Sequence, residues 1–190
     1  MEELQAGDIF LTRGASLISR LIRVFTRSWG ESRTLVNHVG IVVEGGSISQ
    51  AVVVEALRSV TRRRLADGYA GTGTSVAVFR PINLTLPEID VIVQAAERYV
   101  GRKYGYAMIV AHALDWMLNG VYLFRRLIGS DEYPICSWVV AHAYAKAGKT
   151  FGVAPGAASP DDICDFVTEN PDKYMQVRAL VPIARSATSQ

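Results

Sequence analysis

Short runs of hydrophobic residues, separated by polar stretches, recur along the chain. Each run is rich in Val, Ile or Phe and is bounded by Gly, Pro, Ser or Asn, which is the pattern of β-strands joined by turns. The pattern predicts strands at residues 8–13, 38–44, 51–57, 75–81 and 176–183.

Between these runs, hydrophobic residues recur at the three- to four-residue spacing of amphipathic helices. The first predicted helix carries three basic residues on its polar face, Arg20, Arg23 and Arg27. A second follows Pro87, and a third runs from Cys136 to Ala147 and stops at Gly148. A fourth begins at residues 159–162, where Ser precedes Pro and two Asp. Strands come first, helices follow and a strand closes the chain, an order that predicts the α+β class.

Length and composition indicate an ordinary globular domain. The chain has 190 residues, of which 49% are hydrophobic and 20% are charged, values that exclude a disordered chain or a coiled coil. We place a single domain at residues 1–183 and a loose C-terminal tail at 184–190. The two cysteines are too few for a disulfide scaffold.

Motifs for metals and cofactors are absent from the sequence. No His-Glu-x-x-His or paired Cys-x-x-Cys motif occurs, so we expect neither a metal site nor a cofactor. A dinucleotide-binding loop has glycines that come directly after a strand and begin a helix. The segment with Gly68, Gly71 and Gly73 lacks this arrangement. We interpret this glycine segment as a flexible loop near the functional site.

The charge distribution is uneven although the net charge is only +2, which gives no reason to expect a nucleic-acid partner. The first helix and the run Arg62-Arg63-Arg64 form either solvated faces or a basic face that approaches lipid headgroups or an anionic substrate. The acidic start of the chain, Met1-Glu2-Glu3, is unlike a signal peptide, so we expect a cytoplasmic protein.

The apolar segment at residues 105–124 is the most membrane-like part of the chain. It carries three polar residues on one helical face, His112, Asp115 and Asn119, each of which is costly at the centre of a bilayer. The segment therefore indicates a mostly buried amphipathic helix rather than a membrane span. An interfacial helix is the alternative.

Cys136 opens the third predicted helix. A thiol in the first turn of a helix lies near the positive end of the helix dipole and near unpaired backbone N–H groups, which lower its pKa and favour the reactive thiolate. The same N–H groups can hold an oxyanion during acyl transfer. The alternative interpretation of Cys136 is a small buried hydrophobic residue.

A nucleophilic thiol needs a base, and the chain has three histidines. His142 lies on the same helix as Cys136 but points elsewhere, and His112 belongs to the polar face of the segment at 105–124. His38 opens a predicted strand, and Gly40, two residues on, lies on the same face. We expect glycine there to leave room beside the imidazole for another backbone or a substrate.

Glu55 is the candidate third member of the site. If the turn between residues 38–44 and 51–57 centres near Ser47 and Ile48, then Gly40 sits opposite Glu55, and His38 is its diagonal neighbour at roughly 7–8 Å between Cα atoms. A carboxylate in so apolar a strand is costly unless it is paired, and pairing would orient the imidazole. The alternative is an edge-strand Glu that points into water.

Several stretches match one known family together. They are Gly7–Gly14, Leu21–Ser28, Asn37–Val42, Val54–Ala56, Gly101–Tyr104, Cys136–Ala141 and Ser159–Asp162. In these stretches the chain resembles the circularly permuted NlpC-type papain-like cysteine hydrolases, and among them the YaeF/YiiX branch. The resemblance covers about residues 4–183, with gaps at 28–36 and 107–132.

The resemblance implies a small antiparallel sheet packed against a helix that bears the nucleophile. It implies Cys136 as nucleophile, His38 as general base and acid, and Glu55 as the orienting carboxylate. Tyr104 matches a tyrosine that family members place near the catalytic helix, which makes it a candidate for lining the substrate pocket. The chain departs from the family at Trp138, where many relatives have an acidic or polar residue, and in its long apolar segment at 107–132.

We therefore expect a cysteine hydrolase, an amidase or peptidase, that cleaves an amide or ester bond through an acyl-enzyme. The expected substrate is a peptide from a cell-wall fragment or a lipid, and the membrane surface is approached through Arg20, Arg23 and Arg27. Two alternatives remain: a lecithin–retinol-type acyltransferase with the same triad, and a non-catalytic module that binds an amino acid or peptide. Nothing in the sequence predicts an oligomeric state.

Overall fold

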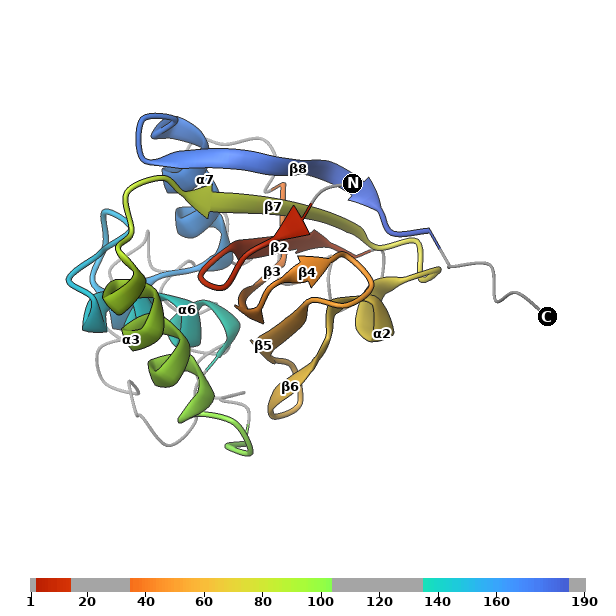
Figure 1. Ribbon diagram of the computed structural model, residues 1–190, viewed down its shortest axis with the longest axis horizontal. Helices are drawn as coiled ribbons and strands as arrows, with labels where there is room; N and C mark the ends of the chain where they lie inside the picture. Colours follow the sequence, from red (N-terminus) through yellow and green to blue (C-terminus); the bar gives the residue numbers. More distant parts are fainter. Residues whose placement is uncertain (1–2, 15–34, 104–134, 185–190) are drawn as a thin grey trace, which may run out of the picture.

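The computed structural model describes residues 3–14, 35–103 and 135–184. Within them, an antiparallel sheet of six strands in the order β6-β5-β3-β2-β7-β8 forms the centre of the molecule (Figure 1). The strands are β2 (Ile9–Arg13), β3 (His38–Glu44), β5 (Val52–Ala56), β6 (Val60–Arg64), β7 (Ser75–Pro81) and β8 (Tyr174–Pro182). A separate pair joins β1 (Glu3–Leu4) to β4 (Gly46–Ser47).

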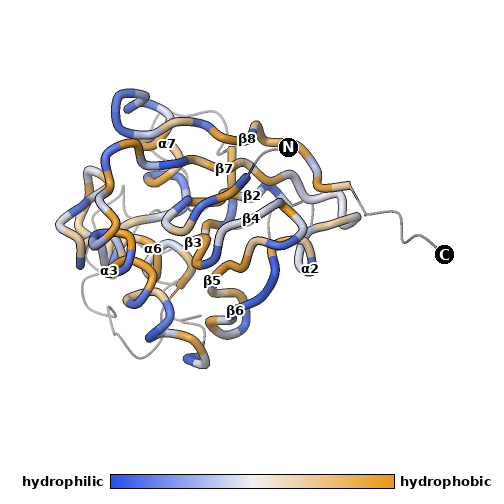
Figure 2. The backbone as a smooth tube through the Cα atoms, in the orientation of Figure 1, coloured by the Kyte–Doolittle hydropathy of each residue, from blue (hydrophilic) through white to orange (hydrophobic). Residues whose placement is uncertain are grey.

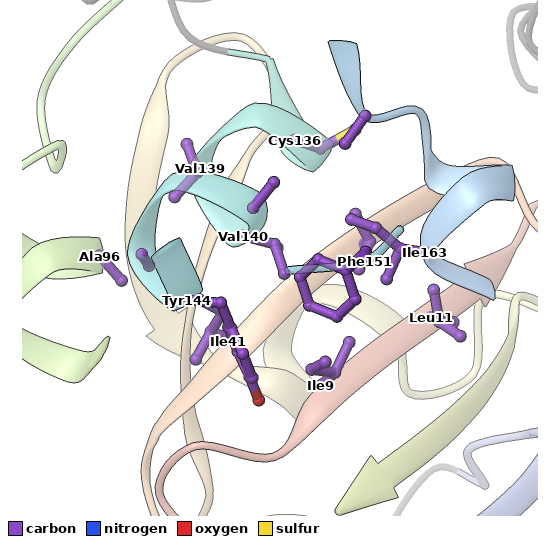
Figure 3. Close-up of a cluster of buried hydrophobic side chains, with 14 of the residues drawn as sticks. Ile9, Leu11, Ile41, Ala96, Cys136, Val139, Val140, Tyr144, Phe151 and Ile163 are labelled. Carbon is purple, nitrogen blue, oxygen red and sulfur yellow. The ribbon is translucent and has the colours of Figure 1, made fainter. Parts of the chain in front are cut away.

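Both faces of the sheet are apolar, because successive residues of a strand point to opposite faces and the central strands are hydrophobic throughout. One face, which includes Val39 and Ile41, packs against α3 (Leu86–Glu97), α6 (Cys136–Lys146) and α7 (Pro160–Glu169). Figure 3 shows part of this cluster, with Tyr144 of α6 near Ile41. The other face, which includes Val42 and Val53, packs against α2 (Leu65–Tyr69). A 3₁₀ helix, η1 (Pro155–Ala157), lies between α6 and α7 in the chain.

Capping residues define the ends of the helices. Ser159 and Asp162 form a capping box at the start of α7, as the sequence predicts. Gly148, at φ +70°, donates its N–H to the carbonyl of Ala145 and closes the C-terminus of α6. Helix α3 begins at Leu86, one residue before Pro87, because Thr85 caps it. Pro87 therefore lies in the first turn of the helix instead of preceding it.

All five predicted strands are present, and their ends differ from the prediction by at most two residues. The mixed composition of helices and antiparallel strands confirms the α+β class. Strand β6 was not predicted, because three of its five residues are arginines. Figure 2 shows it as a hydrophilic strand beside the hydrophobic β5.

The prediction of a flexible loop at the glycine segment is partly wrong. Gly68 lies inside helix α2, whereas Gly71 and Gly73 adopt φ of +70° and +74° in the turns that follow. Among the residues that the structure describes, no helix is long and apolar enough to cross a membrane. Tyr104, the segment at 105–124 and the predicted helix with Arg20, Arg23 and Arg27 lie outside the described residues.

Candidate active site

Cys136 is the first residue of α6, with Ile135 as the N-cap residue in an extended conformation. The helix packs on the sheet through a row of buried residues, and Figure 3 shows Cys136 at its first turn, beyond Val140. The hydroxyl of Tyr144 donates a hydrogen bond to the carbonyl of Gly7, in the loop before β2. This contact fixes the helix relative to the sheet, so the thiol is held at one place, 5% exposed.

His38 is the first residue of β3, and its side chain is buried beside that of Glu55. The Nε2–H of His38 donates to Oε2 of Glu55 at 2.7 Å. The ring of Phe10 lies edge-on to the imidazole, with 6.1 Å between ring centroids. These contacts hold the imidazole from two sides.

Gly40 has a different role from the one expected. A Cβ at this position would lie 2.4 Å from Cε1 of Phe10 and 2.8 Å from the carbonyl oxygen of Val54. The space above Gly40 is therefore filled by the Phe10 ring, so the expectation of room for a substrate is wrong, whereas the expected close approach of another backbone is seen in the Val54 carbonyl. Glycine lets Phe10 pack close enough to contact His38.

The predicted register between β3 and β5 is confirmed, because Gly40 is paired with Glu55. His38 precedes Gly40 by two residues, so it shares a face with Glu55 and is its diagonal neighbour. Glu55 is 1% exposed and β5 is covered on its other side by β6. The alternative, an edge-strand Glu that points into water, is therefore wrong.

Two further side chains contact Glu55 that the sequence reasoning did not assign to the site. The Nε–H of Arg63 donates to Oε1 of Glu55 at 2.6 Å, and the Tyr69 hydroxyl donates to Oε2. The register contains the signal for Arg63: Glu55 is paired with Thr61 of β6, so Arg63 is its diagonal neighbour on the side opposite His38. This signal could be used only by predicting β6, and the arginine run hides that strand.

The run Arg62-Arg63-Arg64 is thus not a uniform basic face. Arg62 points to the other face of the sheet, where it pairs with Glu44 and, at 3.0 Å, with Glu97 of α3. Arg63 turns inward to Glu55. Arg62 and Arg63 both form ion pairs within the protein. Because their charges are already compensated, this run is not favoured as a contact to lipid or substrate.

The electrostatic surroundings favour an ionised thiol at Cys136. Burial by itself raises the pKa of the thiol, but the opposing effects are larger: the charge and hydrogen bond of His38, and the backbone N–H groups of Val39 and Ser137. Together they lower the pKa of Cys136 below its usual value. Because Nε2 of His38 is engaged by Glu55, Nδ1 is the ring nitrogen that remains for the sulfur.

The pKa values of His38 and Glu55 favour a positively charged imidazole and a negatively charged carboxylate beside Cys136. Burial lowers the pKa of His38, yet Cys136 and Glu55 outweigh it and raise the pKa to about 10. Burial likewise raises the pKa of Glu55, yet its hydrogen bond from His38 and its contacts with Tyr69 and Arg63 bring it to about 2. At neutral pH the carboxyl of Glu55 is ionised and His38 is protonated, and the lowered pKa of Cys136 favours a thiolate beside them.

The structure also describes three further groups of α6 and α7, namely His142, Cys164 and Ser137. His142 stacks on Trp138 of its own helix, with 3.7 Å between ring centroids, as expected of a residue that points away from Cys136. Cys164 is buried in α7, and neither cysteine forms a disulfide. The hydroxyl of Ser137 is buried and has no hydrogen-bond partner among the residues that the structure describes. His112 and Tyr104 lie outside the described residues.

Comparisons with known proteins show a likeness in fold to solved structures. No protein-family model matches the chain, and no curated protein does. Among solved structures, the chain is similar to the metalloprotein yiiX from Escherichia coli O157:H7, with a TM-score of 0.55 and 20% sequence identity over 95% of this chain and 88% of that chain. In the described part of this chain, no three His, Cys, Asp or Glu side chains gather in a way that could hold a metal ion.

Proposed function

We propose that this protein is a cysteine hydrolase with a permuted papain-like fold of the NlpC type, in which Cys136 is the nucleophile. The observation that supports this most is the convergence of three buried side chains from three separate elements: Cys136 from the start of α6, His38 from the start of β3 and Glu55 from β5. Thiolate, imidazole and carboxylate in this order are the arrangement by which an enzyme activates a thiol.

In the acylation half of the reaction, the thiolate of Cys136 attacks the carbonyl carbon of an amide or ester. A carbon–sulfur bond forms, and the carbonyl electron pair moves to oxygen. The first-turn N–H groups of α6, which have no carbonyl partners within the helix, are the donors that this proposal assigns to the oxyanion. The intermediate collapses when the imidazolium of His38 gives its proton to the leaving amine or alcohol, and an acyl-enzyme remains.

In the deacylation half, neutral His38 takes a proton from water as the water oxygen attacks the acyl carbon. The carbon–sulfur bond breaks, the carboxylic acid leaves, and the thiolate–imidazolium pair is restored. Glu55 accepts the hydrogen bond of His38 throughout, so the ring keeps one orientation and its positive charge is stabilised. No step requires a metal or an organic cofactor.

The proposed substrates are peptide amides of cell-wall fragments and lipid esters. The residues that would distinguish them include Tyr104 as a pocket-lining residue and Arg20, Arg23 and Arg27 as contacts to a membrane surface, all of them outside the described residues. The proposed location is the cytoplasm. Both substrate classes leave an acyl group on sulfur, so one experiment covers them.

The test is to incubate the protein with a panel of muropeptides and phospholipids and to measure its intact mass. We expect an adduct on Cys136 whose mass identifies the acyl group, and none in Cys136→Ala, while Cys164→Ala, the matched control, still forms it. Release of the acyl group to water indicates a hydrolase, and transfer to an added amine or alcohol indicates an acyltransferase instead. Binding of a panel member with neither adduct nor product would contradict the proposal.

A further inference from the structure

The carboxylate of Glu55 is engaged on both oxygens by donors from three different elements. Oε2 accepts from His38 of β3 and from the Tyr69 hydroxyl at the end of α2, while Oε1 accepts from Arg63 of β6. The Glu55 side chain is 0% exposed and that of Arg63 is 32% exposed. A buried carboxylate is costly without such partners, and His38 alone leaves one oxygen without a donor.

Arg63 and Tyr69 also contact each other. The guanidinium of Arg63 lies over the Tyr69 ring, 5.5 Å from its centroid, in the range of a cation–π contact. The two side chains therefore meet the carboxylate as one unit, in which Arg63 is held both by Glu55 and by the ring.

Gly68 provides the space in which the guanidinium lies. A Cβ at Gly68 would be 2.5 Å from Nη2 and 2.6 Å from Cζ of Arg63, closer than real contacts allow. Glycine inside a helix costs stability relative to alanine, so its presence in α2 asks for a reason in packing. The reason is that any larger residue at this position would clash with the Arg63 guanidinium.

We propose that Arg63 and Tyr69 are positioning residues that hold Glu55 ionised and oriented toward His38, and thereby maintain the charged state of Cys136. Gly68 contributes by leaving the space that the Arg63 guanidinium occupies. This inference rests on the proposed function, since it assigns a role to residues behind the triad. It gives the arginine run and the glycine segment a part in the site, through one member of each.

The physical reason lies in what Glu55 becomes without these donors. Burial raises the pKa of its carboxyl, and the donors oppose that effect. The charged or titratable side chains that reach Glu55 are His38 from β3, Arg63 from β6 and Tyr69 from α2, with Cys136 of α6 beyond His38. When Glu55 is protonated it no longer stabilises the imidazolium, so the thiolate is lost at a higher pH.

The test follows the alkylation rate of Cys136 by iodoacetamide as a function of pH, with mass spectrometry to separate it from Cys164. In Arg63→Gln and Tyr69→Phe we expect the acid limb of the profile to move to higher pH by about one unit, because each variant removes one donor from the carboxylate. The matched controls are Arg62→Gln, next to Arg63 but on the other face, and Tyr174→Phe, which removes the hydroxyl of a buried tyrosine at the start of β8. Both controls keep the wild-type acid limb.

Gly68→Ala separates positioning from folding. The new methyl group displaces only the end of a flexible side chain, and alanine favours the helix, which offsets part of the stability lost when the guanidinium leaves Glu55. We therefore expect the melting temperature to fall less than in Arg63→Gln, while the acid limb moves in the same direction. A merely structural role of this segment would leave the limb unchanged in this folded variant.

The outcomes distinguish this proposal from the one on which it rests. If folded Arg63→Gln, Tyr69→Phe and Gly68→Ala all keep the wild-type acid limb while Cys136 remains more reactive than Cys164, the positioning role is overturned and the thiol site stands. If Cys136 of the wild type is alkylated no faster than Cys164 at any pH, the proposed function itself is overturned.

Discussion

At the scale of single residues, the chemistry of the site depends on how each charge is compensated. Cys136 is buried, which opposes ionisation, yet the imidazolium of His38 and two backbone N–H groups together outweigh the burial. Glu55 is buried too, and three donors keep it ionised. Each group is in contact with at least one of the others, so the effects of substitutions at these positions are not additive.

Cys136→Ala should abolish turnover while leaving the fold intact. The thiol is a small group at a helix end, and His38 and Glu55 keep their own contact without it. We expect a change of about 1 kcal/mol or less in stability, equivalent to a shift of about 2–4 °C in melting temperature for a chain of this size. Calorimetry and turnover on the same preparation check it, and a variant that unfolds would favour a purely structural Cys136.

Glu55→Gln should lower turnover by about 100-fold or more, because the amide cannot stabilise the imidazolium as a carboxylate does. The substitution also leaves Arg63 beside a neutral group, so we expect the free energy of unfolding to fall by about 3 kcal/mol. Substrate binding should be preserved. Turnover equal to that of the wild type would remove Glu55 from the proposed triad.

The same carboxylate makes stability depend on acidity in a defined window. The pKa of Glu55 falls from 4.5 to about 2 on folding, so its contribution is fully present above pH 4.5 and is lost as the pH falls towards 2. Urea unfolding from pH 6 to pH 2 should therefore show the wild type losing its advantage over Glu55→Gln across this interval. A constant difference between the two proteins would show that Glu55 does not titrate in this way.

At the scale of elements, five of the strands and the register between β3 and β5 were predictable from the sequence. Apolar runs bounded by turn residues located five strands, and the turn near Ser47 set the register that places Gly40 opposite Glu55. Strand β6 was not predictable, because its arginines are explained only by partners from distant elements, Glu55 and Glu97. The start of α7 was predictable because its cap is local chemistry, whereas α3 begins earlier than predicted because Thr85 caps it.

Gly40→Ala tests the packing between β2, β3 and β5. The added methyl group would meet the Phe10 ring and the Val54 carbonyl, and the carbonyl belongs to a backbone that cannot yield easily. We expect a loss of about 1–3 kcal/mol in urea unfolding, together with slower alkylation of Cys136 as Phe10 is pushed against His38. Gly68→Ala is the contrasting substitution, for which we expect a smaller loss of stability, because the new methyl group meets only a flexible side chain.

At the scale of the whole molecule, the sheet brings together residues that are far apart in the chain. His38, Glu55 and Cys136 meet because β3 and β5 are neighbours and α6 packs across them, an arrangement that no local pattern encodes. Register made the pairing of His38 with Glu55 a testable hypothesis, whereas the pairing of Cys136 with His38 was predicted from the comparison of the three histidines and from the family resemblance. The filling of the space above Gly40 by Phe10 could not be predicted, because it depends on side-chain packing between strands.

The proposed domain limits can be tested by truncation. Ile183 is buried and its carbonyl accepts the N–H of Gly71, so the ordered contacts reach this residue. A chain that ends after Ile183 should keep the melting temperature and activity of the full chain. A chain that ends after Asp172 lacks β8 and the buried Tyr174, and it should lose cooperative unfolding. Loss of stability in the first truncation would contradict a domain at 1–183.

The proposal of an activated thiol is tested by the alkylation rates of the two cysteines in the unmodified chain, measured with iodoacetamide between pH 5 and pH 9. An ordinary thiol, with a pKa of about 8.5, is almost wholly protonated at pH 6. We expect Cys136 to react rapidly at pH 6, far faster than Cys164, and to lose this advantage in His38→Ala. Equal labelling of both cysteines, with rates that rise only near pH 8.5, would contradict a thiolate maintained by His38.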